Sequence, residues 1–169
     1  MSTATDVGFT EMRVAKVVGF RVPAEESHSY VVLDEVAGAR HLVIEIGEPE
    51  AFLLAASLQG VQWRRPMTFD FVATLVRSLG GHVRQVRLDR VIDGAYAATV
   101  EVDGPQGTAL ADARTSDALN LAALTGAPVF AAPQMLADCA ARLAADSGEA
   151  DRGRLALTAA PMTIRRAET

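Results

Sequence analysis

Several features that mark other classes of protein are absent from this sequence, and each absence narrows the fold or the function. The 169 residues contain one cysteine, Cys139, so an intramolecular disulfide is impossible. Residues 1–9 lack the basic start and the apolar run of a signal peptide. No stretch reaches the length of about 18 apolar residues that crosses a bilayer. We therefore expect a cytoplasmic protein with no membrane partner.

Aromatic residues and positive charge are also scarce. Aromatics make up 5% of the chain and apolar residues 50%, so small aliphatic side chains must supply most of the packing. The formal charge is −5, whereas nucleic-acid binding draws on clustered lysine and arginine. Any contact with nucleic acid would therefore need a local basic patch. No Walker motif or nucleophile elbow is present, and His28, His41 and His82 are too widely spaced to predict a zinc site.

The hydrophobic pattern predicts one α+β domain over residues 10–146, between a flexible N-terminus (1–9) and a mobile C-terminal tail (147–169). The expected fold is two antiparallel three-stranded units, each followed by a helix, and then a C-terminal helix. Strands are expected at residues 12–22, 29–36, 42–46, 82–92, 96–102 and 109–112, with a short strand at 129–130. Helices are expected at residues 48–60, 68–79 and 116–125, and around 136–143.

Three local features qualify this pattern. Lys16 interrupts the apolar face of the first strand. The alternation of the fourth strand slips between Val83 and Val86, which predicts a β-bulge. Asp93-Gly94 is a strong hairpin signal between the fourth and fifth strands.

The two units share an order of elements that suggests an internal repeat. Sliding the first unit onto the second by 67 residues (117 minus 50) aligns Glu45 with Asp112 and Glu50 with Asp117. The identities are few and mostly alanine or leucine, so a chance match is an open alternative. In a true repeat, each half presents one acid at a strand end and another in the first turn of the next helix.

The segment Asp112–Asp117 runs from a strand end into a helix N-terminus, where free backbone N–H groups attract anions. Arg114 adds a planar, bidentate phosphate donor. Asp112 and Asp117 could hold Mg²⁺, which takes only one or two protein carboxylates and keeps several waters. A purely structural interpretation also fits, because Ser116 or Thr115 is a good N-cap and Arg114 could simply pair with either acid.

The segment Trp63–Asp70 is the second candidate. Arg64 and Arg65 beside Trp63 could bind phosphate while the indole stacks on a base, as in proteins that bind single strands. The structural alternative is an exposed loop in which Thr68 or Asp70 caps the next helix.

Together these segments resemble the bifunctional nuclease domain family. The likeness covers roughly residues 12–136, and Asp112-Ala113-Arg114 with Ser116-Asp117-Ala118 is its most specific string. The strings that carry it, in order along the chain, are Val18–Phe20, Val31–Glu35, Leu42–Gly47 with Glu50 and Ala51, Arg65–Thr68 with Asp70, Asp93–Ala97, Asp112–Arg114 with Ser116–Ala118, and Gly126–Val129.

The family takes its name from plant members described as degrading both RNA and DNA. The resemblance therefore implies a divalent-metal-dependent nuclease that acts on single-stranded DNA or RNA, with Mg²⁺ or Mn²⁺ as its ion. Arg65 and Arg114 would clamp phosphate, and Trp63, Arg64 and Ser116 would contact the substrate. The metal ligands would be Glu45, Glu50, Asp70, Asp112 and Asp117.

This sequence departs from the family pattern at three positions. Phe69 stands where histidine is usual, and Thr115 and Val43 stand where proline is usual. Without that histidine, the obvious proton carrier at neutral pH is missing. General acid–base work would then fall on a carboxylate or a metal-bound water.

The competing interpretation is a non-catalytic oligomeric or ligand-binding module that keeps the family fold. In that case the signature segments join two repeats or two subunits, and Arg114 with Asp117 is a structural pair. We also expect a homodimer, because an apolar chain with few aromatics needs a partner for leftover surface.

Overall fold

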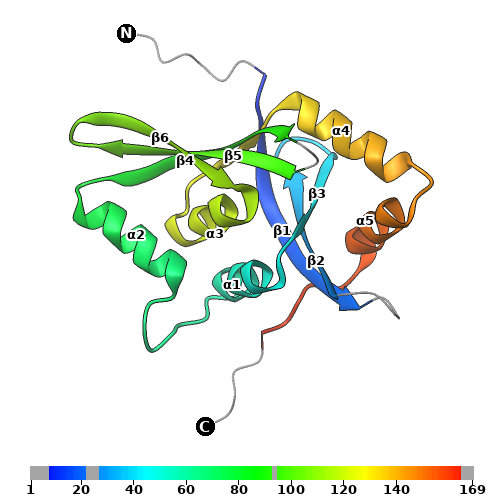
Figure 1. Cartoon of the computed structure of the whole chain (residues 1–169), viewed down its shortest axis with the longest axis horizontal. Coiled ribbons are helices and arrows are strands. Elements are labelled where there is room, and N and C mark those ends of the chain that lie inside the picture. Colours follow the sequence, from blue (N-terminus) through cyan, green and yellow to red (C-terminus); the bar gives the residue numbers. More distant parts are fainter. Residues whose placement is uncertain (1–7, 22–26, 93–94, 165–169) are drawn as a thin grey trace.

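The computed structural model describes residues 8–21, 27–92 and 95–164, which form a seven-stranded mixed sheet with helices packed around it (Figure 1). The strands are β1 (Thr10–Arg21), β2 (Ser27–Glu35), β3 (His41–Ile46), β4 (His82–Ile92), β5 (Ala95–Gly104), β6 (Gly107–Arg114) and β7 (Val129–Ala131). The helices are α1 (Glu48–Leu58), α2 (Thr68–Ser78), α3 (Thr115–Thr125), α4 (Pro133–Ala144) and α5 (Gly148–Thr158). In this part of the chain, no helix is long and apolar enough to cross a membrane.

The sheet order β3-β2-β1-β7-β4-β5-β6 confirms the two predicted three-stranded units. The short strand β7 separates them, pairing antiparallel with β1 and parallel with β4. In both units the order of strands along the chain runs outward from β7, and β1 and β4 on its two sides point in opposite directions. In Figure 1 they also cross steeply, so the sheet is strongly twisted. Helices α1 and α3, which follow β3 and β6, pack against each other.

The two strand irregularities predicted within the described residues have structural causes. The register of β1 against β2 shifts between Val14 and Lys16, which removes Lys16 from the apolar alternation. Its ammonium donates instead to the carbonyls of Leu157 (2.8 Å) and Ala159 (2.7 Å) at the end of α5. The predicted bulge in β4 is confirmed by a register shift after Val83. The hairpin signal at residues 93–94 lies outside the described residues.

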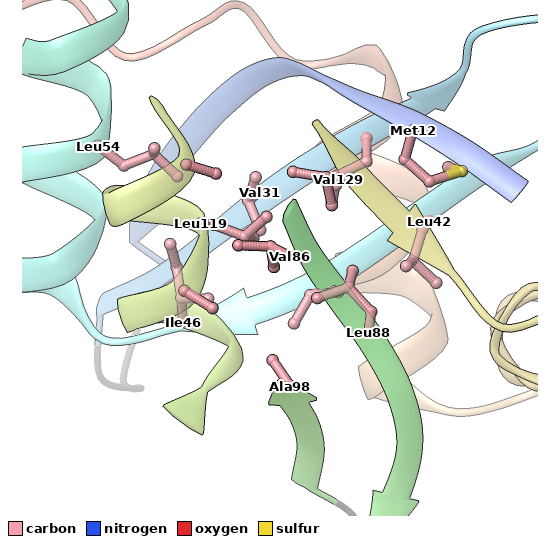
Figure 2. Close-up of a cluster of buried hydrophobic side chains, with 14 of the residues drawn as sticks. Met12, Val31, Leu42, Ile46, Leu54, Val86, Leu88, Ala98, Leu119 and Val129 are labelled. Atoms are coloured by element: carbon pink, nitrogen blue, oxygen red, sulfur yellow. The ribbon is translucent and has the colours of Figure 1, made fainter. Parts of the chain in front are cut away.

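One aliphatic core joins both units, as the scarcity of aromatic residues predicts. Figure 2 shows Val31 from β2, Val86 from β4, Leu54 from α1 and Leu119 from α3 converging on it, and all four are fully buried. Because both halves share this core, α1 and α3 are fixed relative to each other. Their first turns, which follow almost directly on β3 and β6, are therefore fixed as well.

Helix α4 covers the outer edge of the sheet at β3. The outward N–H of Val43 donates to the Cys139 thiol (3.3 Å), which is buried on α4. Cys139 is therefore a buried packing residue, as its apolar stripe predicts, that also satisfies an edge-strand donor.

The segment expected to be a mobile tail from residue 147 contains helix α5, which corrects the expectation of no regular structure there. Ser147 caps it by accepting from the Ala150 N–H (3.2 Å). Its buried stripe is Ala150, Gly153 and Ala156. A Cβ on Gly153 would lie 2.6 Å from a methyl of Leu143, so the two helices approach at glycine. Small residues give little hydrophobic signal, and for this reason the helix was missed.

Candidate functional site

Arg114 stands where β6 becomes α3, and its side chain joins two helices. It is the N-cap of α3 with an extended backbone, so its side chain projects over the first turn. Its Nε and Nη2 donate to the two carboxylate oxygens of Asp117, each at 2.8 Å. Nη2 also donates to Glu50 Oε1 in the first turn of α1, at 2.8 Å. We refer to Arg114, Glu50 and Asp117 as the Arg114 triad.

The triad combines fixed geometry with access to solvent. The Arg114 side chain is 68% exposed, while Asp117 is 32% and Glu50 18% exposed. The bonds to Asp117, and then those to Glu50, raise the pKa of Arg114 above its usual value, so the guanidinium stays charged. Neither of these carboxylates nor any other described group accepts from Nη1. This nitrogen is available to an anion.

A buried amide that sequence reasoning missed holds the two acidic helix starts together. Asn120, on α3, is fully buried. Its amide nitrogen donates to the carbonyl of Glu50 (3.1 Å) and to that of Ser116 (3.0 Å). The one signal in the sequence is that Asn120 is a lone amide among the alanines and leucines of this helix.

Replacing Asn120 with alanine is expected to lower the free energy of unfolding by about 1–3 kcal/mol, because the carbonyl of Glu50 loses a buried donor. Urea denaturation followed by circular dichroism measures this. The matched control is Gln134→Ala, which removes an exposed amide and should change stability by less than about 0.5 kcal/mol. Equal stability losses in the two variants would show that the amide does not tie α1 to α3.

Two hollows meet at Arg114. The first, of about 600 Å³, is mostly apolar and holds all three triad residues together with Thr68 and Phe69 of α2; we call it the triad hollow. The second, of about 510 Å³, lies between the start of α3 and helices α4 and α5. Its polar lining residues are Glu45, Arg114, Thr115, Ser116, Tyr96, Arg142, Glu149 and Arg152.

The second hollow brings Glu45 and Ser116 to Arg114 but leaves Glu45 engaged elsewhere. The Glu45 carboxylate contacts a ring nitrogen of His28 (2.7 Å) and accepts from the hydroxyl of Tyr30 (3.2 Å). Arg142 donates to the Tyr96 hydroxyl (2.9 Å) and also pairs with Glu149. This side of Arg114 is therefore a balanced polar network rather than a basic pocket.

The second sequence segment forms a separate hollow of about 540 Å³, the Trp63 hollow, lined by Trp63, Arg65 and Asp70. Arg64 is exposed and does not line it. Asp70 accepts from the Met67 N–H (2.9 Å), which confirms its structural alternative as a helix-capping residue. Arg65 and Arg114 thus line different hollows.

The predicted set of metal ligands does not come together. Among residues 8–21, 27–92 and 95–164, no group of three His, Cys, Asp or Glu side chains is placed to hold an ion. Asp112 lies exposed on β6 opposite Thr99 and lines neither the triad hollow nor the Trp63 hollow. Glu50 and Asp117 do converge, through their shared arginine. A pair of carboxylates fits Mg²⁺ bound together with substrate phosphate, and does not fit a preformed three-ligand centre.

A sequence model of the bifunctional nuclease domain matches residues 31–144, which include the triad and both arginine segments. The chain belongs to the bifunctional nuclease domain family. It is 31% identical over 138 residues to Uncharacterized protein Rv1829 of Mycobacterium tuberculosis, with 82% of each chain covered. It is also 31% identical over 115 residues to Bifunctional nuclease 2 of Arabidopsis thaliana, covering 66% of this chain and 35% of the plant protein.

The family assignment gives Phe69 a particular meaning. This residue, which is one of the three departures from the pattern that the resemblance implies, lines the triad hollow beside Glu50, Arg114 and Asp117. The position of the usual histidine and the most specific family string therefore face the same hollow. Among the hollows of the described residues, the triad hollow is the one that joins position 69 with Arg114 and Asp117.

Proposed function

We propose that the protein is a nuclease that hydrolyses phosphodiester bonds in single-stranded DNA or RNA, with its reaction centre at the Arg114 triad. The supporting observation is the convergence of Arg114, Glu50, Asp117 and position 69 on one hollow. The second support is the family, which includes a plant relative named as a bifunctional nuclease.

In this proposal Arg114 binds a non-bridging oxygen of the phosphodiester through Nη1, at the N-terminus of α3, where the helix dipole also favours negative charge. Asp117 orients the guanidinium through both of its carboxylate oxygens, and the attacking water gives its proton to solvent. Glu50 keeps the guanidinium in place. The water oxygen bonds to phosphorus, the bond to the leaving oxygen breaks, and that oxygen takes a proton from solvent.

Dependence on Mg²⁺ or Mn²⁺ is part of the same proposal. Glu50 and Asp117 would hold the ion together with substrate phosphate. Bound there, the ion would neutralise charge on the phosphodiester and activate water.

The test is cleavage of labelled single-stranded DNA and RNA by the purified protein, with Mg²⁺, with Mn²⁺ and with chelator. Asp117→Asn and Glu50→Gln are expected to lose most of the activity, and chelation is expected to abolish it. Asp112→Ala is a further arm, because Asp112 precedes the triad on β6. Activity lost in Asp112→Ala but kept in both triad variants would move the reaction centre away from the triad.

Introducing the missing histidine makes a separate prediction. Phe69→His is expected to raise cleavage about 10-fold or more, because it places a proton carrier at the triad hollow. The added activity should change with pH near 6.5, where histidine titrates. A control variant, Phe71→His, places the same side chain on the exposed face of α2. Equal gains in both variants would contradict a reaction centre in the triad hollow.

A specific observation also favours the non-catalytic alternative, a homodimeric module. Residues 107–112 of the edge strand β6 are exposed, including Leu110 at 64%, whereas the opposite edge is covered by α4. An open edge of this kind pairs readily with another strand, here the β6 of a second copy. Light scattering on the purified protein tests whether it is a dimer, and a dimer should dissociate in Leu110→Lys.

We also propose a cytoplasmic location for the protein, which cell fractionation tests.

A further inference from the structure

The Trp63 hollow brings two arginines together without an acidic partner for either among the described residues. Several arginines of the described chain have an acidic partner, as Arg40 does in Glu35 and Arg142 in Glu149. Arg65 and Arg77, which both line the Trp63 hollow, form no ion pair with any described residue. A protein with a formal charge of −5 thus presents two uncompensated arginines in one hollow.

The single carboxylate in the lining of this hollow offsets only one of the two positive charges. Asp70 is the one acid there, and it accepts from the Met67 N–H at 2.9 Å. Arg77 is steadied by its own helix, with Nη2 donating to the Thr74 hydroxyl (3.3 Å). The hollow therefore carries a net positive charge and free guanidinium donors, which match phosphate oxygens.

An aromatic platform stands beside these arginines. Trp63 is 37% exposed, and its ring leans against Phe52 with centroids 6.0 Å apart and planes tilted by 42°. Phe52 on α1 thus supports the indole while leaving part of it accessible. An exposed indole next to arginine is the combination on which an unpaired nucleobase stacks.

We propose that the Trp63 hollow is a binding site for single-stranded nucleic acid that is distinct from the reaction centre. Phosphates bind Arg65 and Arg77, and one base stacks on Trp63. This inference rests on the proposed function for the identity of the strand. In a duplex the bases stack on each other, so an intact duplex cannot offer a base to the indole.

The position of α2 explains why such a site helps cleavage. Thr68 and Phe69 line the triad hollow, whereas Asp70 and Arg77 line the Trp63 hollow, so the two hollows lie on two flanks of one helix. A flexible strand several nucleotides long can occupy both. The Trp63 hollow then contributes to substrate affinity and does not take part in bond cleavage.

The test measures binding of a fluorescent 12-nucleotide single strand, as DNA and as RNA, by anisotropy in chelator so that no cleavage occurs. Trp63→Ala is expected to weaken binding about 5- to 150-fold, the range for loss of one stacked base. Arg65→Ala with Arg77→Ala is expected to weaken it at least about 10-fold and to reduce the salt dependence by about 1.4 in the log–log slope. The variant Arg65→Lys with Arg77→Lys keeps both positive charges and should therefore keep the wild-type slope.

The matched control is Arg90→Ala. Arg90 is also exposed and has no ion pair among the described residues, but it lies eight positions along β4 from His82 at the rim of the hollow, about 26 Å away. Binding should not change in this variant. Wild-type affinity in Trp63→Ala and in the double arginine variant, or a duplex bound as tightly as the single strand, would overturn the inference.

The same variants separate this inference from the nuclease proposal. The double arginine variant should raise KM for long single strands and leave kcat unaltered. If the wild type binds single strands as described yet never cleaves them, the binding site stands and the nuclease proposal fails. If it cleaves single strands with a KM that neither Trp63 nor the two arginines affect, the nuclease proposal stands and this site fails.

Discussion

Arg114→Ala is expected to lower the rate of single-strand cleavage by about 100-fold or more, the loss typical of removing one positioned donor to developing negative charge. Arg114→Lys should restore little of it. An ammonium lacks the planar fork that bonds Asp117 through two nitrogens and Glu50 at the same time. Single-turnover cleavage of a labelled strand measures both rates, and circular dichroism checks that the fold is kept.

Loss of Arg114 also leaves Glu50 and Asp117 facing each other without a cation, so a decrease in stability should accompany the loss of activity. The triple variant Arg114→Ala, Glu50→Gln, Asp117→Asn removes that repulsion. It is expected to recover stability and to remain inactive. A triple variant that regains cleavage would show that none of the three side chains acts in the reaction, and would move the reaction centre away from the triad.

Leu119→Ala is expected to lower the free energy of unfolding by about 2–5 kcal/mol, the usual range for a buried leucine. Leu119 is fully buried on α3 (Figure 2), a helix that packs against β4, β5 and β6 of the second unit and against α1, which follows the first unit. The cavity would therefore weaken the contact between the halves. Urea denaturation should show a lower midpoint with an unchanged slope.

The control for this variant is Leu155→Ala on α5. Leu155 is 48% exposed, so its replacement should change stability by less than about 0.5 kcal/mol. A similar loss in both variants would contradict a single core shared by the two halves. A change of slope in Leu119→Ala would instead indicate that the halves unfold separately.

The sequence predicts most of the fold because its signals are local. Alternating aliphatic residues locate the strands, and Pro49 and Gly126 mark a helix start and a helix end. The bulge in β4 is also a local signal, since a parity slip is visible in the letters. Helix α5 lacks such a signal, because its packing depends on alanine and glycine fitting closely against α4.

The candidate site is predictable only where its contacts are local or follow from the repeat. Arg114 and Asp117 are three residues apart at a helix start, so their pairing is visible in the sequence. Glu50 lies 64 residues from Arg114 in the sequence. Its alignment with Asp117 in the suggested repeat was the one indication that the two acids share a site. The hollow that Arg65 lines, just before α2, depends on tertiary packing, and the sequence alone could not show that it differs from the triad hollow of Arg114.

The most direct test of the account is a crystal of the protein grown with Mn²⁺ and a phosphorothioate single strand that resists cleavage. We predict anomalous density for Mn²⁺ at the carboxylates of Glu50 and Asp117, with a phosphate of the strand bonded to Arg114. A strand bound with no group at the triad, or Mn²⁺ density on other acids, would contradict the assignment of the reaction centre.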